Sequence, residues 1–320
     1  MLFSEEHKKG GIMKRILRTL LIVTVLFSFG GCTSFQESLF EFSMSAERHR
    51  SHMIVKKADI GDQEISYLER EGKGETIVLL HGFGADKDNW IRFARQMPED
   101  YRIVAIDLLG HGDNSRDFNK TYDLDYITKG FTKTVETLNL DRFHLAGNSM
   151  GGYVSKIYAV QNPQKVITLG LFDSAGLVSP TPSDLQAALD RGENPLIVNS
   201  REDFDRLMKF AFYKEPFLPW PLRSVVARKY ISYGPFNLKM WNDIWAERKE
   251  ATDLLPRLHM PVFLIWGDRD RILHVSSVEI YQRSIPQIET VILKNCGHAP
   301  MIERPKETAD FYVTFLDKNG

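Results

Sequence analysis

Ser149 stands in the stretch LAGNSMGGYVSK, residues 145–156, which has glycines at positions 147, 151 and 152. In a Gly-x-Ser-x-Gly pattern, small neighbours let a serine occupy a strained turn and project its hydroxyl into a pocket. A helix that begins at such a turn directs its N-terminus at the site, which favours negative charge there. The stretch therefore predicts a nucleophilic serine. The alternative is a glycine-rich structural turn before a helix.

A serine nucleophile needs a base, and His298 is the best placed of the nine histidines. It lies in residues 295–300 (NCGHAP), which follow the last expected strand of the chain. Sites assemble at the carboxyl ends of parallel strands, so a histidine in this loop is expected to reach the serine. His81 and His111 also follow apolar runs, but both precede Ser149, and we expect them to shape loops by hydrogen bonding.

The acid is expected after the strand that precedes this histidine, in residues 266–270 (WGDRD). Asp270 is our prediction because it lies further from the strand. Asp268 is the alternative, as a residue that caps the turn or pairs with Arg269. Asp173 follows an earlier apolar run, at a less common position for the acid. The carboxylate would hold the imidazole in one tautomer and stabilise its protonated form.

The negative oxygen that develops on the substrate needs hydrogen-bond donors. We expect one from the backbone N–H of Met150, directly after the serine, and the second from the loop at residues 81–84 (HGFG). The Phe83 N–H is our prediction for the second donor. Gly82 and Gly84 allow that loop to approach closely, although an ordinary strand-to-helix turn would have a similar composition.

Apolar runs with strand character alternate with helical patterns along much of the chain, which predicts a parallel sheet covered on both faces. The 320 residues are 43% apolar and 26% charged, and the net charge of −1 indicates no nucleic-acid partner. The expected strands are residues 63–69, 76–80, 102–107, 143–147, 166–172, 261–266 and 290–293. The expected helices are residues 89–97, 124–138, 150–160, 275–285 and 306–316.

The alternation stops near residue 177 and resumes near residue 256. The intervening segment is rich in aromatic residues and proline and has no strong strand pattern. A long insertion in a compact domain is more often a functional cover than a passive loop. The predicted organisation is a signal segment at 1–32, a tether at 33–57, a core at 58–177 and 256–320, and an inserted cap at 178–255.

The N-terminus has the features of an export signal. A basic stretch at residues 13–18 leads into an apolar run at residues 19–29, about the length of a signal-peptide core and short for a membrane span. Two glycines then precede Cys32, which resembles the bacterial lipobox, in which the cysteine is acylated. We expect a membrane-anchored lipoprotein on the periplasmic or outer-membrane side of a Gram-negative bacterium; the alternative is an uncleaved anchor helix. Cys296 then has no partner and is expected to be a small packed residue.

Taken together, five motifs resemble the α/β-hydrolase family, over roughly residues 62–317, and within it bacterial lipases and membrane-associated monoacylglycerol lipases. The motifs are HGFG (81–84), DLLGHG (107–112), GNSMGG (147–152), WGDRD (266–270) and GH (297–298).

The resemblance implies a mostly parallel central sheet with helices on both faces and an inserted helical cap. It also implies a serine carboxylic-ester hydrolase that acts on lipophilic esters such as acylglycerols, with no metal or organic cofactor. Two alternatives are another serine reaction on the same scaffold, either thioester or C–C bond cleavage, and a non-catalytic lipid-binding lipoprotein.

Overall fold

The computed structural model describes residues 33–246 and 250–320. The chain divides into two compact units, a smaller one that ends at Ala46 and includes Leu218–Arg228, and a larger one of Glu47–Phe217 and Lys229–Gly320. Within the smaller unit, Arg228 Nη1 donates a hydrogen bond to Gln36 Oε1 at 2.9 Å. The predicted signal segment, with Cys32, lies outside the described residues. No helix in the described ranges is both long enough and apolar enough to cross a membrane.

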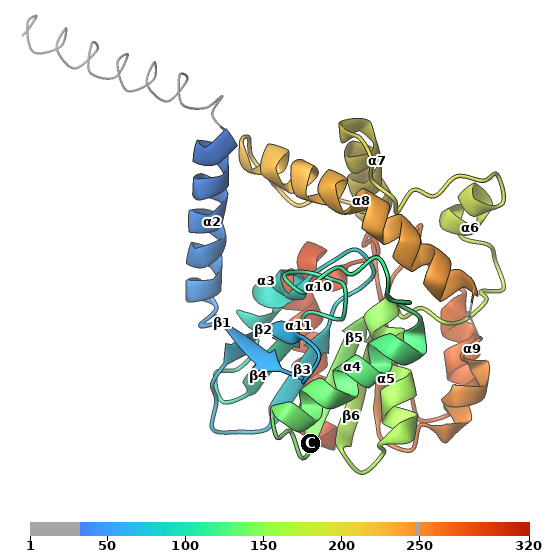
Figure 1. Ribbon diagram of the computed structural model, residues 1–320. Helices are drawn as coiled ribbons and strands as arrows, with labels where there is room; N and C mark the ends of the chain where they lie inside the picture. Colours follow the sequence, from blue (N-terminus) through green and yellow to red (C-terminus); the bar gives the residue numbers. More distant parts are fainter. Residues whose placement is uncertain (1–32, 247–249) are drawn as a thin grey trace, which may run out of the picture. The chain divides into compact units, whose positions relative to one another are not determined.

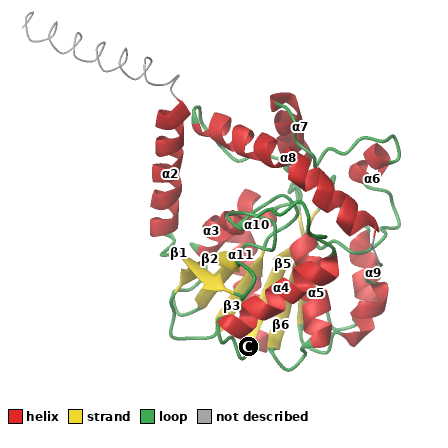
Figure 2. Cartoon of the chain, in the orientation of Figure 1, coloured by secondary structure: helices red, strands yellow, loops and turns green. Residues whose placement is uncertain are grey.

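The larger unit is built on an eight-stranded sheet, drawn as yellow arrows in Figure 2. Its strand order is β1-β2-β4-β3-β5-β6-β7-β8. The two pairings at the β1 edge are antiparallel and all the others are parallel. The strands are β1 (Ile54–Asp59), β2 (Glu64–Arg70), β3 (Thr76–Leu80), β4 (Arg102–Ile106), β5 (Phe143–Asn148), β6 (Val166–Phe172), β7 (Val262–Gly267) and β8 (Glu289–Leu293).

The central strands form the core because their side chains are buried on both faces. In β3, the four side chains of residues 77–80 are all 0% exposed. A continuous apolar run is the expected pattern for a parallel strand between two helical layers, and each fully buried Leu, Ile or Val contributes about 1.5–3 kcal/mol. The predicted mostly parallel sheet with helices on both faces is therefore confirmed.

Helices cover both faces of the sheet (Figure 1). One face carries α4 (Leu124–Thr137), α5 (Met150–Gln161) and α9 (Ser277–Ser284), and the other carries α3 (Ile91–Ala94), α10 (Pro300–Glu303) and α11 (Pro305–Asn319). Asp123 caps α4, since its side chain accepts a hydrogen bond from the Tyr126 N–H at 2.7 Å. The short 3₁₀ helix η1 (Lys87–Trp90) precedes α3.

The segment between β6 and β7 is helical, with no strand among its described residues. It contains α6 (Asp184–Leu189), α7 (Arg201–Ala211), α8 (Leu222–Ala246) and the 3₁₀ helix η2 (Thr252–Arg257). The side chains of Ser183 and Ser200 cap α6 and α7. Aromatic residues here differ in environment, because Phe204 is buried whereas Phe217 is 83% exposed.

Two elements differ from their sequence predictions. β1 lies partly within the expected tether, so the sheet begins at Ile54 rather than after residue 57. β1 is an edge strand with mostly exposed side chains, which leaves no clear apolar alternation to detect. The helix expected over residues 89–97 is divided between η1 and the four-residue α3.

Candidate active site

Ser149 occupies a strained turn between β5 and α5. Its φ and ψ are 53° and −118°, a conformation that non-glycine residues rarely adopt. The turn is tightly enclosed: a Cβ at position 147 would lie 2.4 Å from the Gly151 carbonyl, and one at position 151 would lie 2.4 Å from the Leu80 oxygen. Glycine at both positions therefore lets β5, α5 and β3 meet closely enough to form the turn, as the sequence pattern predicted.

His298 and Asp270 lie together in loops that follow β8 and β7. The His298 Nδ1–H donates to Asp270 Oδ2 at 2.7 Å, and the two residues are 7% and 5% exposed. The other Asp270 oxygen, Oδ1, accepts the N–H groups of Ile272 at 2.8 Å and Leu273 at 3.0 Å. These bonds orient the carboxylate towards the imidazole.

Asp268 is directed elsewhere. Its Oδ1 accepts the Asn295 N–H at 2.7 Å, and its carboxylate lies 3.7 Å from Lys294 Nζ. Asp268 therefore connects the loops after β7 and β8, and its Oδ1 also lies 3.8 Å from Nε of Arg269, the pairing considered from the sequence.

The backbone of His298 is held beside the serine turn. Asn148, the residue before Ser149, donates from Nδ2 to the carbonyls of Phe172 and His298, both at 3.0 Å. In addition, a Cβ at Gly82 would lie 3.1 Å from Ser149 Cβ. The serine is thus enclosed by the histidine loop and by the loop predicted to contribute to the oxyanion hole.

The side chain of His81 holds the backbone of the loop at residues 81–84 in place. This side chain is 0% exposed; its Nε2 accepts the Leu108 N–H at 3.0 Å and its Nδ1–H donates to the Gly82 carbonyl at 2.8 Å. Burial lowers the pKa of His81, so the ring is neutral and keeps this tautomer. His111 likewise contacts the Leu109 carbonyl through Nδ1 at 3.0 Å, and burial lowers its pKa to about 3.

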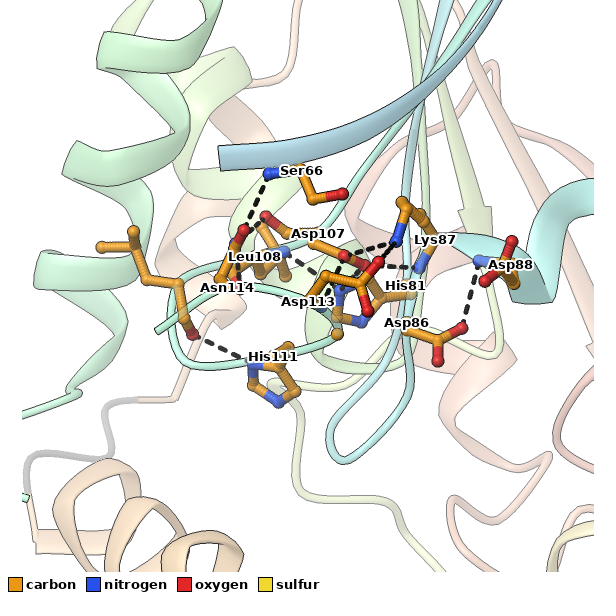
Figure 3. A network of polar contacts seen from close by, with 12 residues as sticks. Ser66, His81, Asp86, Lys87, Asp88, Asp107, Leu108, His111, Asp113 and Asn114 are labelled. Carbon is orange, nitrogen blue, oxygen red and sulfur yellow. Dashed lines mark hydrogen bonds and ion pairs between the residues drawn. The ribbon is translucent and has the colours of Figure 1, made fainter. Parts of the chain in front are cut away.

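A buried ion pair, which the sequence analysis did not identify, lies directly after this loop (Figure 3). Lys87 Nζ lies 2.8 Å from Asp107 Oδ2, with side chains 1% and 0% exposed. The N–H groups of Lys87 and Asp113 also donate to the Asp107 carboxylate, at 2.7 and 2.9 Å. The available signal was a lysine and an aspartate near the ends of two neighbouring strands, which by itself does not indicate contact.

Asp173 also lies close to the histidine. Ligand atoms of Asp173, Asp270 and His298 all lie within 4.8 Å of one another, and all three residues are buried. Among the described residues this is the group that could hold a metal ion. The 2.7 Å bond between Asp270 and His298 already uses the imidazole nitrogen nearest the carboxylates, so the arrangement fits an acid–base pair better than a metal centre.

Ser149 and Met150 form part of the wall of a cavity of about 480 Å³. This volume is within the usual range for small-molecule sites. Trp241, Trp245 and Phe83 all line the cavity. The rings of Trp241 and Trp245 stack with their centroids 5.1 Å apart, and the ring of Phe83 meets that of Trp241 edge-on with a centroid distance of 5.6 Å. Further apolar walls come from Leu124, Tyr153, Leu177, Leu185, Leu189, Leu196, Ile244, Ile272 and Leu273.

Comparison with known proteins decides the family. Residues 75–305 match the family model of the alpha/beta hydrolase fold. The chain belongs to this family. It is 33% identical over 306 residues to Lipase 1 of Psychrobacter immobilis, covering 92% of this chain and 96% of the relative.

Two further matches extend this similarity. The chain is 30% identical over 262 residues to the human (Homo sapiens) monoacylglycerol lipase ABHD6, covering 78% of each. The crystal structure of a membrane phospholipase A, described as a bacterial virulence factor, superposes with a TM-score of 0.88 at 38% identity, over 95% of this chain and 98% of that one. This α/β-hydrolase is therefore an ester hydrolase, as the sequence predicted.

Proposed function

We propose that this enzyme hydrolyses lipophilic carboxylic esters, with acylglycerols as the principal class, through Ser149, His298, Asp270 and an acyl-enzyme. The main support is the buried 2.7 Å bond between His298 and Asp270, whose loops meet the strained serine turn at an apolar cavity. A serine on a strained turn and an imidazole oriented by a carboxylate are the parts that acyl transfer requires.

The reaction would begin with attack of Ser149 Oγ on the ester carbonyl. Because Asp270 occupies Nδ1 of His298, Nε2 is the nitrogen left to accept the serine proton. The N–H groups of Phe83 and Met150 would stabilise the negative oxygen of the tetrahedral intermediate. The protonated imidazole then gives its proton to the leaving alcohol, and water repeats the sequence to release the carboxylic acid.

The cavity favours substrates with one apolar chain and a small polar group. Most of its lining is apolar, and Ser179, Gln186 and Glu250 add polar side chains. Pockets of this kind bind by apolar burial and use a few polar groups for orientation. The names of the relatives, which include lipases and a monoacylglycerol lipase, support the same substrate class. Thioesters and C–C bond substrates remain the alternative for the same machinery and would be separated by a substrate panel.

We propose that residues 178–255 form a cap over this site. Leu185 and Leu189 of α6, together with Trp241 and Ile244 of α8, contribute to the cavity lining. A cap built from these helices would exclude water from the acyl chain and from the intermediate.

We further propose that the enzyme is exported and anchored at a bacterial membrane through acylation of Cys32. The support is the basic and apolar pattern that precedes this cysteine, and the phospholipase that resembles the chain is described as a membrane protein. Several acyl chains would make the attachment stable. Unchanged processing and unchanged membrane retention of Cys32→Ser in a Gram-negative host would contradict the lipid anchor.

The proposed nucleophile is tested by hydrolysis of p-nitrophenyl esters and monoacylglycerols and by labelling with a fluorophosphonate probe. We expect Ser149→Ala to lower kcat by about 10⁶-fold and to abolish labelling, whereas Ser115→Ala, at an exposed serine, leaves both unchanged. Asp270→Asn should lower kcat by about 10⁴-fold, because it would favour the wrong imidazole tautomer. Wild-type turnover by Ser149→Ala would refute the assignment, and absence of labelling in the wild type would favour the lipid-binding alternative.

A further inference from the structure

A second carboxyl group lies beside the pair of His298 and Asp270, and the mechanism above does not use it. Asp173 directly follows β6, and its side chain is 0% exposed. Its φ of 43° is in the left-handed region, which aspartate and asparagine tolerate better than most residues. A buried acid held in a strained conformation calls for a specific role.

The two oxygens of Asp173 differ in their contacts. Oδ1 accepts the Gly267 N–H at 2.9 Å. Oδ2 is buried and, among the residues that the structure describes, no donor lies within hydrogen-bonding distance of it. An ionised carboxylate with one oxygen left unpaired away from water would be strongly destabilising.

The neighbouring Asp270 makes ionisation of Asp173 still less favourable. Asp270 lies within the same 4.8 Å cluster, and its carboxylate already accepts two backbone N–H groups and the His298 Nδ1–H. When two carboxylates share a buried site, the pKa of one of them is strongly raised. Asp270, with three donors against one for Asp173, is the member that keeps the negative charge.

We propose that Asp173 is a neutral carboxylic acid whose Oδ2–H is donated to the carboxylate of Asp270, and that it acts as a positioning residue for the catalytic pair. A single proton on Asp173 satisfies its unpaired oxygen and removes the repulsion between the two acids. The inference rests on the proposed roles of Ser149, His298 and Asp270.

The surrounding groups agree with a proton on Asp173. Burial, followed by the charge of Asp270, raises the pKa of Asp173 well above its usual range, and Glu303 adds a smaller effect in the same direction. The Gly267 N–H opposes the shift but does not reverse it. Burial also raises the pKa of the Cys296 thiol, so this neighbour is neutral.

The proposed proton has two consequences for catalysis. It adds a fourth hydrogen bond to Asp270 and so fixes the carboxylate in the orientation that meets His298. It also keeps one negative charge beside the imidazole rather than two. A second negative charge would favour the protonated imidazole and withdraw the base that Ser149 needs.

Two substitutions distinguish a neutral acid from an ionised one. In Asp173→Asn, the amide oxygen can still accept the Gly267 N–H, and the NH₂ group can donate to Asp270 as the acid does. We expect kcat within about threefold of the wild type and an unchanged acid limb of the pH–rate profile. Asp173→Ala removes the donor and should lower kcat by about 10- to 100-fold with little change in KM, because Asp173 is not part of the cavity wall.

An ionised Asp173 predicts the opposite result for the asparagine variant. Loss of a negative charge so close to His298 would move the acid limb of the profile and lower kcat by tenfold or more, and this outcome would overturn the proposal. The test does not depend on whether the alanine variant folds, because the asparagine variant alone separates the two cases. Loss of activity after dialysis against EDTA would instead indicate a cation between the acids and would also overturn it.

A spectroscopic measurement makes the test independent of activity. The infrared difference spectrum between the wild type and Asp173→Asn at pH 7 should contain the C=O band of a protonated carboxylic acid. The same band should be present when Ser149→Ala is compared with the double variant Ser149→Ala/Asp173→Asn. Its absence would refute the neutral acid, whereas an active Ser149→Ala would refute the proposed nucleophile and leave the band unaffected.

Discussion

Replacing Lys87 by methionine removes the ammonium group that lies 2.8 Å from Asp107, while keeping an unbranched side chain. The two side chains are 1% and 0% exposed, so water cannot reach the carboxylate that is left behind. The N–H groups of Lys87 and Asp113 would still donate to it. The substitution therefore leaves a buried negative charge that is partly, but not fully, compensated.

The size of the effect follows from this partial compensation. Removal of one partner from a buried ion pair typically costs about 3–5 kcal/mol. Because two backbone donors remain, we expect the lower end, about 3 kcal/mol, and a melting temperature lowered by about 5–10 °C. Although burial by itself lowers the pKa of Lys87, the charge of Asp107 raises it above its usual value. Lys87 is therefore charged at pH 7, and its contribution to stability is lost as the pH rises through its raised pKa.

Thermal unfolding followed by circular dichroism tests this expectation, with Lys129→Met as the matched control. Lys129 pairs with Asp125 at 2.6 Å, but the side chains are 71% and 67% exposed, so its loss should leave the melting temperature unchanged. The difference between the wild type and Lys87→Met should persist in 1 M NaCl, because buried pairs are little screened by salt. A Lys87→Met protein that melts within about 2 °C of the wild type would refute the reasoning.

Three further predictions concern substitutions in the larger unit. Burial lowers the pKa of Lys156 from its usual 10.5 to about 7, so between these two pH values the unfolded state binds the proton and the folded state does not. In denaturant titrations, the free energy of unfolding of the wild type should therefore rise with pH across that window relative to Lys156→Met. Glu303 accepts the Gly297 N–H at 3.0 Å and two N–H groups of the segment after α7, so Glu303→Ala should lower kcat several-fold in steady-state assays, with Glu303→Gln less affected. In Gly151→Ala the new Cβ would lie 2.4 Å from the Leu80 oxygen, and we expect loss of esterase activity or of soluble protein.

Much of the core could be predicted because its strands are apolar runs that end at residues with distinctive chemistry. β3 ends before His81, β5 before Ser149 and β7 before Asp270, and each run is buried in the structure. The edge strand β1 could not be predicted in the same way, since only Ala58 among its six residues is buried. Burial on both faces leaves a pattern in the sequence, whereas pairing through the backbone alone leaves little.

The contacts that orient the site were less predictable. Lys87 and Asp107 are 20 residues apart, and Glu303 reaches N–H groups about 90 residues earlier in the chain. The sequence around one charged residue does not indicate a distant partner, because a lysine or glutamate on a loop is usually solvated. The fold had to bring the loops together before these charges could be recognised as buried or bridging.

Asp173 and Asp270 illustrate the limit most clearly. From the sequence they were alternative positions for one catalytic acid, after β6 and after β7. The structure pairs β6 with β7 in parallel, so the residues that follow them emerge side by side at the same edge of the sheet. Only Asp270 bonds to His298, yet Asp173 is too close to be independent of it. The chemical question is then which of the two acids carries a proton. Asp173 accepts one hydrogen bond and has one oxygen without a donor, so the proposed proton lies on Asp173.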